Sequence, residues 1–409
     1  MSTFVRRILG TAGIVPAAVL ATAAAADPTF AQSTPIRMLV PDLTISGEAN
    51  DLTSAVNLVV APNGNVIVLV RDEIRGRVFA QDGRLIRSFG RNGGGPGDIA
   101  SANLQHAGMV GDTLWIYDGG ARRIALFTSD GRPIRDVSFR RTEDPWQAGH
   151  AEWAWMGTSI EPERLLSGGV AIAVPGVGVE VVRSAVYPST GQPLLVMTWE
   201  GKVTGAPLTL PLQIRDFRLQ EPLKNLRSFV QVFAHLPKYA FSADGRRLVI
   251  ANVRDGPRPY VELLHLSTAG DTIGTVRVPF TPDPISRRSV DSVIANWTAP
   301  LPAGRRPPGY PPSPFAGHER ELRASLVVPP YFSPFSQVML ANDGTTWLRW
   351  HVPGTDLRWL LVSARGDVLM QVEQPTFVSI RIIDGAVWGT AADSVGFVNL
   401  IRFAVRDRR

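Results

Sequence analysis

Cysteine is absent from the 409 residues of this chain. Its absence excludes disulfide bonds, thiolate zinc sites, a cysteine nucleophile and a lipid-anchored amino-terminal cysteine. Lysine is nearly absent as well, with three residues against 39 arginines, and the formal net charge is +6. The arginines are scattered singly rather than clustered in runs. This scatter favours biased codon usage over a surface that binds an acidic partner.

The amino terminus has the layout of a secretory signal peptide. Arg6 and Arg7 precede an apolar, Ala-rich segment at 8–26, which a proline interrupts and small residues follow. A membrane anchor is the alternative, but the segment barely reaches the roughly 20 apolar residues that span a bilayer. We predict that residues 1–31 are a signal peptide and that the mature chain is periplasmic or secreted, with no membrane span. Sec and twin-arginine export both stay open, and export argues against a nucleic-acid partner.

A pair of turns recurs along the rest of the chain. A first turn precedes a run of strand-favouring residues, and about twenty residues later a second turn lies between two more apolar runs. Asp-Gly and Asn-Gly dipeptides favour tight hairpins, because their residues tolerate positive φ. The six first turns are Asn63-Gly64, Gly111-Asp112, Ser167-Gly168-Gly169, Asp244-Gly245, Asp343-Gly344 and Asp384-Gly385.

The apolar runs predict sheets that are covered on both faces. Every residue from Val66 to Val70 is apolar, whereas a strand with one face in water would alternate. Sheets of four strands stacked radially meet this demand, and units of roughly 40 to 50 residues match propeller blades. We predict an all-β, six-bladed β-propeller of four-stranded antiparallel blades over residues 32–409. The sixth unit lacks an outer strand, and residues 36–40 are expected to supply it and close the ring.

Residues 281–334 interrupt the regular spacing of the repeated turns. A helix is expected from Asp283 to Trp297, with Val290, Val293 and Ile294 on its apolar side. A proline-rich stretch follows, which cannot enter a sheet interior, and GHERELRASL predicts a second short helix. The insertion is either an inert surface excursion or a lid or partner-binding arm.

The segment SFGRNGGGPGDI, from Ser88 to Ile99, lies between the first and second units. A phosphate-binding loop would need Gly-Lys-Ser/Thr and a following helix, but Asp98 and a strand follow here. We predict a structural connector without phosphate affinity, in which glycines allow tight bends and a proline stiffens one. The connector residues are Gly90, Arg91, Gly95, Pro96 and Gly97.

This segment resembles a connection in bacterial six-bladed β-propeller proteins related to the NHL-repeat propellers, within the TolB-like propeller superfamily. There, Phe-Gly-Arg, a glycine-rich stretch and Gly-Pro-Gly with an acid follow one another, as in residues 89–98 here. The stretch VVPPYFSPFSQVMLANDGTTWLRW is similar to a second motif of that group. The resemblance covers most of residues 36–409. It implies the fold, but many activities share this scaffold.

No motif for a particular chemistry is present. The sequence HERE at His318 lacks the second histidine of a zinc protease, and no Gly-x-Ser-x-Gly elbow occurs. Candidate binding residues are the polar ones expected near the channel mouth: Asp51, Asn57, Asp98, His106 and His235. His106, with Asp51 and Asp98, could bind a divalent cation such as calcium or act as acid and base. We favour the alternative that these residues solvate a wet channel.

Three tryptophans, Trp146, Trp153 and Trp155, lie between the second and third units. They could stack on a sugar or anchor a partner, although filling space between blades is the interpretation we favour.

The sequence thus predicts an exported, monomeric propeller that binds a small molecule, peptide or protein and needs no cofactor. One alternative is a metal-dependent propeller hydrolase or lyase, similar to lactonases, that acts at the central channel. A purely structural component of the cell envelope is the third possibility. Neither the ligand nor the choice among these classes follows from the sequence.

Overall fold

The protein is described here by a computed structural model. It describes residues 34–71, 73–100, 107–118, 121, 123–138, 169–174, 178–183, 192–197, 203–210, 232–299, 315–352, 355–376, 378–383 and 385–407. Within these ranges the chain is all-β, with strands β1 to β24, two α-helices and one short 3-10 helix. The predicted signal peptide and the three tryptophans between units two and three lie outside the described residues.

Three four-stranded sheets are antiparallel, with their strands in chain order. One contains β2 (Ala55–Val60), β3 (Val66–Val70), β4 (Arg75–Phe79) and β5 (Leu85–Phe89). The next contains β6 (Ala107–Val110), β7 (Thr113–Asp118), β8 (Arg123–Thr128) and β9 (Pro133–Ser138). Another contains β14 (Lys238–Phe241), β15 (Arg247–Arg254), β16 (Tyr260–Ser267) and β17 (Thr272–Pro279). Each confirms a predicted unit of two hairpin turns.

The sheet of the third unit departs from the predicted antiparallel order. It contains β10 (Gly169–Val174), β11 (Gly178–Arg183), β12 (Gln192–Met197) and β13 (Val203–Leu210). Their order is β11-β10-β12-β13, and β10 pairs parallel with β12. The expectation of antiparallel pairing throughout was therefore wrong here. β10 lies between β11 and β12 and pairs with both, so β11 takes the edge of the sheet and β12 pairs with β10 instead of with β11. All three runs are largely apolar, so hydrophobic pattern alone does not decide this order.

One eight-stranded sheet combines the last two units with the amino-terminal strand. Its first half contains β18 (Phe335–Leu340), β19 (Thr346–Val352), β20 (Thr355–Val362) and β21 (Val368–Glu373). Its second half contains β22 (Ser379–Ile383), β23 (Ala386–Ala392), β24 (Val398–Asp407) and β1 (Ile36–Ile45). The pairing of β1 with β24 is antiparallel, which confirms that residues 36–40 add a strand to the last unit. In addition, β1 pairs parallel with β21 and so joins the two halves.

The sheets bury apolar side chains on both faces, as the unbroken apolar run of β3 indicated. Val66, Val68 and Val70 pack with side chains of β22–β24, whereas Ile67 and Leu69 pack with side chains of β7. The first sheet is therefore covered on one side by the last unit and on the other by the second. Packing the first unit against the last is the arrangement that turns a row of sheets into a ring.

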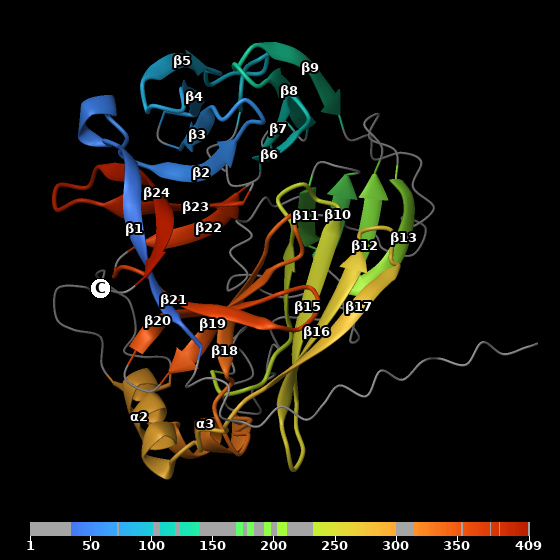
Figure 1. The fold of residues 1–409 in the computed structure, drawn as a ribbon, viewed down its shortest axis with the longest axis vertical. Coiled ribbons are helices and arrows are strands. Elements are labelled where there is room, and N and C mark those ends of the chain that lie inside the picture. The colour runs from blue at the N-terminus through green and yellow to red at the C-terminus, as the bar shows by residue number, and fades with distance from the viewer. Residues whose placement is uncertain are drawn as a thin grey trace, which may run out of the picture.

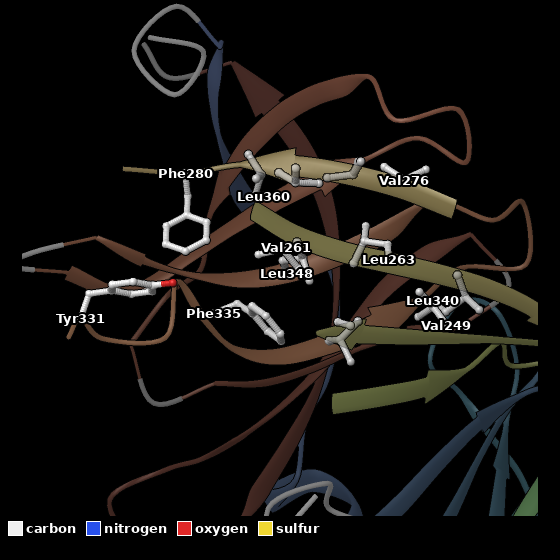
Figure 2. Packing of buried hydrophobic residues seen from close by; sticks show 14 residues of the cluster. Val249, Val261, Leu263, Val276, Phe280, Tyr331, Phe335, Leu340, Leu348 and Leu360 are labelled. Carbon is white, nitrogen blue, oxygen red and sulfur yellow. The ribbon is translucent and has the colours of Figure 1, made fainter. Parts of the chain in front are cut away.

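The sheets follow one another around a common centre, toward which β2, β6, β18 and β22 lie (Figure 1). In the third sheet, β11 and not β10 is the edge strand on this side. Contacts join β2 to β6, β14 to β18, and β18 to β22. Figure 2 shows the core between two neighbouring sheets, where Val261 and Leu263 of β16 face Leu348 and Leu360. This arrangement is that of a β-propeller.

The insertion forms both predicted helices, α2 (Arg287–Thr298) and α3 (Glu319–Ser325). Ser286 caps α2 by accepting a hydrogen bond from the Ser289 N–H at 3.0 Å. Val290 and Ile294 are buried in a small core shared with α3. The helices lie at the rim of the ring, away from its centre (Figure 1). Among the described residues, no helix has the length and apolarity to cross a membrane.

Candidate functional site in the central channel

A cavity of about 480 Å³ lies at the centre of the ring. Residues of β2, β6, β14, β18 and β22, the first strands of their units, line it. Pockets that bind small molecules typically enclose about 300–1,000 Å³. The volume and the central position make this cavity the candidate ligand site.

The cavity wall is largely apolar. Each of the five strands contributes at least one half-buried apolar side chain, and the larger of these are Val60, Met109, Phe241, Met339 and Ile382. A half-buried side chain keeps surface that a ligand can cover. Ligand pockets combine such walls with a few polar groups that orient the ligand.

The cavity reaches the surface at the turns that end these strands. Pro62, Gly111 and Ala243 line this end and are exposed. A hydrogen bond joins two of these turns from neighbouring units, because the Asp244 N–H donates to Asn342 Oδ1 at 3.2 Å. We take this end as the entrance to the cavity.

A polar pair also lines the cavity. Arg381 Nη1 of β22 donates to Asn57 Oδ1 of β2 at 2.6 Å, across 324 positions of sequence. Asn57 is buried, while Arg381 is exposed. Asn57 was among the predicted binding residues, but Arg381 was not. The available signal was a single charge inside the apolar run SIRII.

Asp98 lies in the glycine-rich connector and serves its structure. Its carboxylate accepts from Arg91 Nε at 2.6 Å and from the Gly95 N–H at 2.9 Å. The hydrogen bond from Arg91, and then that from Gly95, lowers the pKa of Asp98 against the opposing effect of burial. Gly90 and Gly97 have positive φ, at 74° and 77°. Gly95 is not among the residues with positive φ, so its backbone conformation does not itself require glycine.

Arg123, a buried residue that the sequence analysis did not single out, holds the connector through hydrogen bonds. Arg123 Nη2 donates to the Asp98 carbonyl at 2.9 Å, and Nη1 donates to Asp136 Oδ2 at 2.7 Å. Its Nε lies 3.3 Å from Asp118 Oδ2, and Asp118 also accepts from the Ala100 N–H at 2.8 Å. Asp118 and Arg123 flank the turn between two apolar strands, and these opposite charges were the available signal.

His235 lies against the insertion instead of lining the cavity. Its Nε2 is 2.9 Å from the Tyr331 carbonyl, its Nδ1 is 3.5 Å from Asp255 Oδ1, and its ring lies on the Tyr331 ring. The Tyr331 hydroxyl donates to Asp255. Burial and this hydrogen bond raise the pKa of Tyr331 well above its usual range. His351 Nε2 lies 3.1 Å from Asp283 Oδ2, so a second histidine also contacts the base of the insertion.

Asp51, another predicted binding residue, is not among the residues that line the cavity. Asp51 is exposed at the end of the 3-10 helix Glu48–Asn50, with a φ of 49°. His106 lies outside the described residues. Within the described part of the chain, no three His, Asp or Glu side chains are placed to hold a metal ion together.

Comparisons with known proteins do not assign this chain to a family. No protein-family model matches it, and no curated protein sequence matches it. A solved DUF4221 family member from Bacteroides vulgatus is similar at a TM-score of 0.43 and 10% identity, over 91% of this chain and 99% of that one. A putative exported protein from Bacteroides fragilis is similar at 0.42 and 10% identity, over 91% and 96%. A gluconolactonase from Xanthomonas campestris is similar at 0.37 and 10% identity, over 91% and 97%. Each TM-score is below 0.5, so the fold assignment rests on the sheets and their packing.

Proposed function

We propose that this chain is an exported, monomeric β-propeller that binds a small, largely apolar ligand in its central channel. Four separate sheets and the two halves of the eight-stranded sheet would be six blades, with β1 as the closing strand. The resemblance to NHL-repeat propellers supports this count. Residues 1–31 would be removed on export to the periplasm or medium, and residues 32–409, with the insertion at 281–334, would form the domain.

One observation carries the binding proposal. Five inner strands each place a half-buried apolar side chain in one cavity, next to the polar pair of Asn57 and Arg381. A channel needed only for structure would gain stability by filling this space with larger side chains. Walls that keep apolar surface accessible are typical of ligand sites.

The test uses Nile red, a neutral apolar fluorophore, and the mature full-length chain. Ala243 is exposed at the cavity entrance, in the turn Ser-Ala-Asp-Gly, so Ala243→Trp should narrow the entrance and weaken binding at least tenfold. Ala364 is exposed in the similar turn Ser-Ala-Arg-Gly between β20 and β21, and Ala364→Trp is the matched control. Equal binding by both variants and the unchanged chain would contradict a channel site.

A second measurement addresses the metal-dependent hydrolase or lyase. Elemental analysis of protein purified without chelators should find no stoichiometric metal if the channel is a simple binding site. A stoichiometric divalent cation, with a melting temperature that falls on chelation, would favour the enzyme instead.

A further inference from the structure

We infer that the outer edges of the first two sheets bind a surface of anionic phospholipid. The contact would be made by residues 84–87, Arg-Leu-Ile-Arg, at the beginning of β5, and by residues 132–135, Arg-Pro-Ile-Arg, at the beginning of β9. We call these two segments the edge motifs. They are not among the residues that line the channel cavity, so this inference does not depend on the channel ligand.

The edge motifs are accessible over their whole length. All eight of their residues are exposed, and β5 and β9 are edge strands that lie at the outside of the ring (Figure 1). Leu85, Ile86 and Ile134 are 40%, 42% and 49% exposed. Aliphatic side chains of this kind gain free energy when they enter the apolar boundary of a membrane. The two edges therefore offer apolar surface to a partner.

The edge motifs belong to neighbouring sheets whose outer parts are in contact. Phe89, at the end of β5, packs on Phe127 of β8, with the ring centroids 5.0 Å apart. Gly131, in the turn before β9, lies against the same ring, because a Cβ at Gly131 would approach Phe89 to 2.6 Å. These contacts hold the two motifs on adjoining parts of one surface.

The protein neutralises the arginines of the edge motifs only in part. Arg84 and Arg135 form no ion pair and no side-chain hydrogen bond with the residues that the structure describes. Arg132 Nε lies 3.0 Å from Asp130 Oδ2, and Arg87 acts on the same carboxylate from the neighbouring motif. One carboxylate thus serves two arginines, while the other two arginines keep their charge for a partner.

Two further acidic residues lie beside the edge motifs, and both have a role in the fold. Asp82 accepts a hydrogen bond from the Arg84 N–H at 3.0 Å within its turn. Asp136 accepts one from buried Arg123 at 2.7 Å. Four exposed arginines therefore stand against the carboxylates of Asp82 and Asp130, and the surface keeps a positive balance. Folding brings these arginines together, although they are scattered singly in the sequence.

The composition of the edge motifs favours a lipid surface over a pairing strand. Charged residues protect an edge strand against pairing, but an edge that needed only this protection would not expose Ile86 and Ile134. Pro133 also lacks the N–H that a pairing strand would use. Anionic phospholipids repeat one phosphate group over a flat area, which matches one motif repeated on two neighbouring sheets. Arginine binds phosphate oxygens with its planar fork, and the aliphatic side chains enter between the headgroups.

The experiment measures co-sedimentation of the mature chain with vesicles of phosphatidylcholine, with and without phosphatidylglycerol. We expect binding to the anionic vesicles to be stronger by about tenfold or more, and to weaken at high salt. The double variant Arg84→Gln with Arg135→Gln should lose about tenfold in that binding, because it removes both unpaired charges. Its control is Arg287→Gln with Arg288→Gln, which removes two exposed arginines from α2 and should leave binding unchanged.

A second pair of variants tests the apolar contact. Ile86→Ser with Ile134→Ser should also weaken binding to the anionic vesicles, whereas Ile273→Ser, at a 53% exposed position of the edge strand β17, should not. Equal binding to both kinds of vesicle, or equal losses in the edge-motif variants and their controls, would overturn the inference. Binding to soluble polyglutamate without binding to vesicles would also overturn it, in favour of an acidic protein partner.

Discussion

Replacing Arg123 by methionine should destabilise the propeller far more than the same replacement of Arg91, although both arginines contact the glycine-rich connector. Arg123 is buried and bonds to the Asp98 carbonyl, to Asp136 and to Asp118, whose side chain is fully buried. Arg91 contacts the connector from outside, with 79% of its side chain exposed. Both substitutions thus remove a guanidinium group, one from a buried site and the other from an exposed site.

The expected magnitude follows from what each variant leaves behind. Arg123→Met leaves the buried carboxylate of Asp118 without its ionic partner, and breaking a buried pair in this way costs about 3–5 kcal/mol. At about 2.1 cal/mol/K of unfolding entropy per residue, a chain of 409 residues loses about 1.2 °C of melting temperature per kcal/mol. The expected loss is therefore about 4–6 °C. Arg91→Met removes an ion pair whose arginine is exposed, and the Asp98 carboxylate keeps its hydrogen bond from the Gly95 N–H, so the melting temperature should change by about 1 °C or less.

The assay is thermal unfolding at neutral pH, followed by circular dichroism and by calorimetry on both variants and the unchanged chain. A double variant, Asp118→Asn with Arg123→Met, should recover part of the lost stability, because it also removes the unpaired charge. Equal losses for Arg123→Met and Arg91→Met would refute the assignment of Arg123 as the buried support of the connector.

Three further substitutions test the fold. Gly97→Ala should cost at least about 1 kcal/mol in chemical unfolding, because φ is positive and a Cβ would approach a proline, whereas Gly94→Ala meets no neighbouring atom and should be neutral. Leu39→Ala should lower the free energy of unfolding by about 2–5 kcal/mol, because Leu39 of β1 is buried. The control is Val40→Ala, at an exposed position of the same strand. Similarly small losses for both variants would argue against β1 as a structural strand. Burial, and to a smaller extent a nearby arginine, lowers the pKa of His265 from about 6.5. The stability that its neutral form contributes is complete above pH 6.5 and is lost as the pH falls through the folded-state pKa. The unchanged chain should thus lose more melting temperature between pH 7.5 and 5.0 than His265→Leu, and equal losses would contradict this linkage.

The candidate site could be predicted only in part. Asn57 was identified because a polar residue on an expected inner strand must face either the channel or a neighbour. Arg381 was missed, although it sits at a similar place in its own unit, because one arginine in a chain with 39 of them carries little signal. His235 was placed near the channel from its position before an inner strand. In the structure, His235 instead lies against Tyr331 at the base of the insertion.

The sequence by itself determined the local architecture and the burial of the sheets. Asp-Gly and Asn-Gly turns between apolar runs specified hairpins, and the unbroken apolar run of β3 specified a sheet covered on both faces. Such features are encoded locally, because turn geometry and burial act on neighbouring residues. Only the tertiary structure decided which strands meet: the parallel pairing of β10 with β12, the contact of β1 with β21, and the hydrogen bond between Arg381 and Asn57. The partners in the last two contacts are distant in sequence, and packing around the ring brings them together. The parallel pairing lies within one sheet, where the choice of neighbouring strand depends on the whole sheet and not on a local hydrophobic pattern.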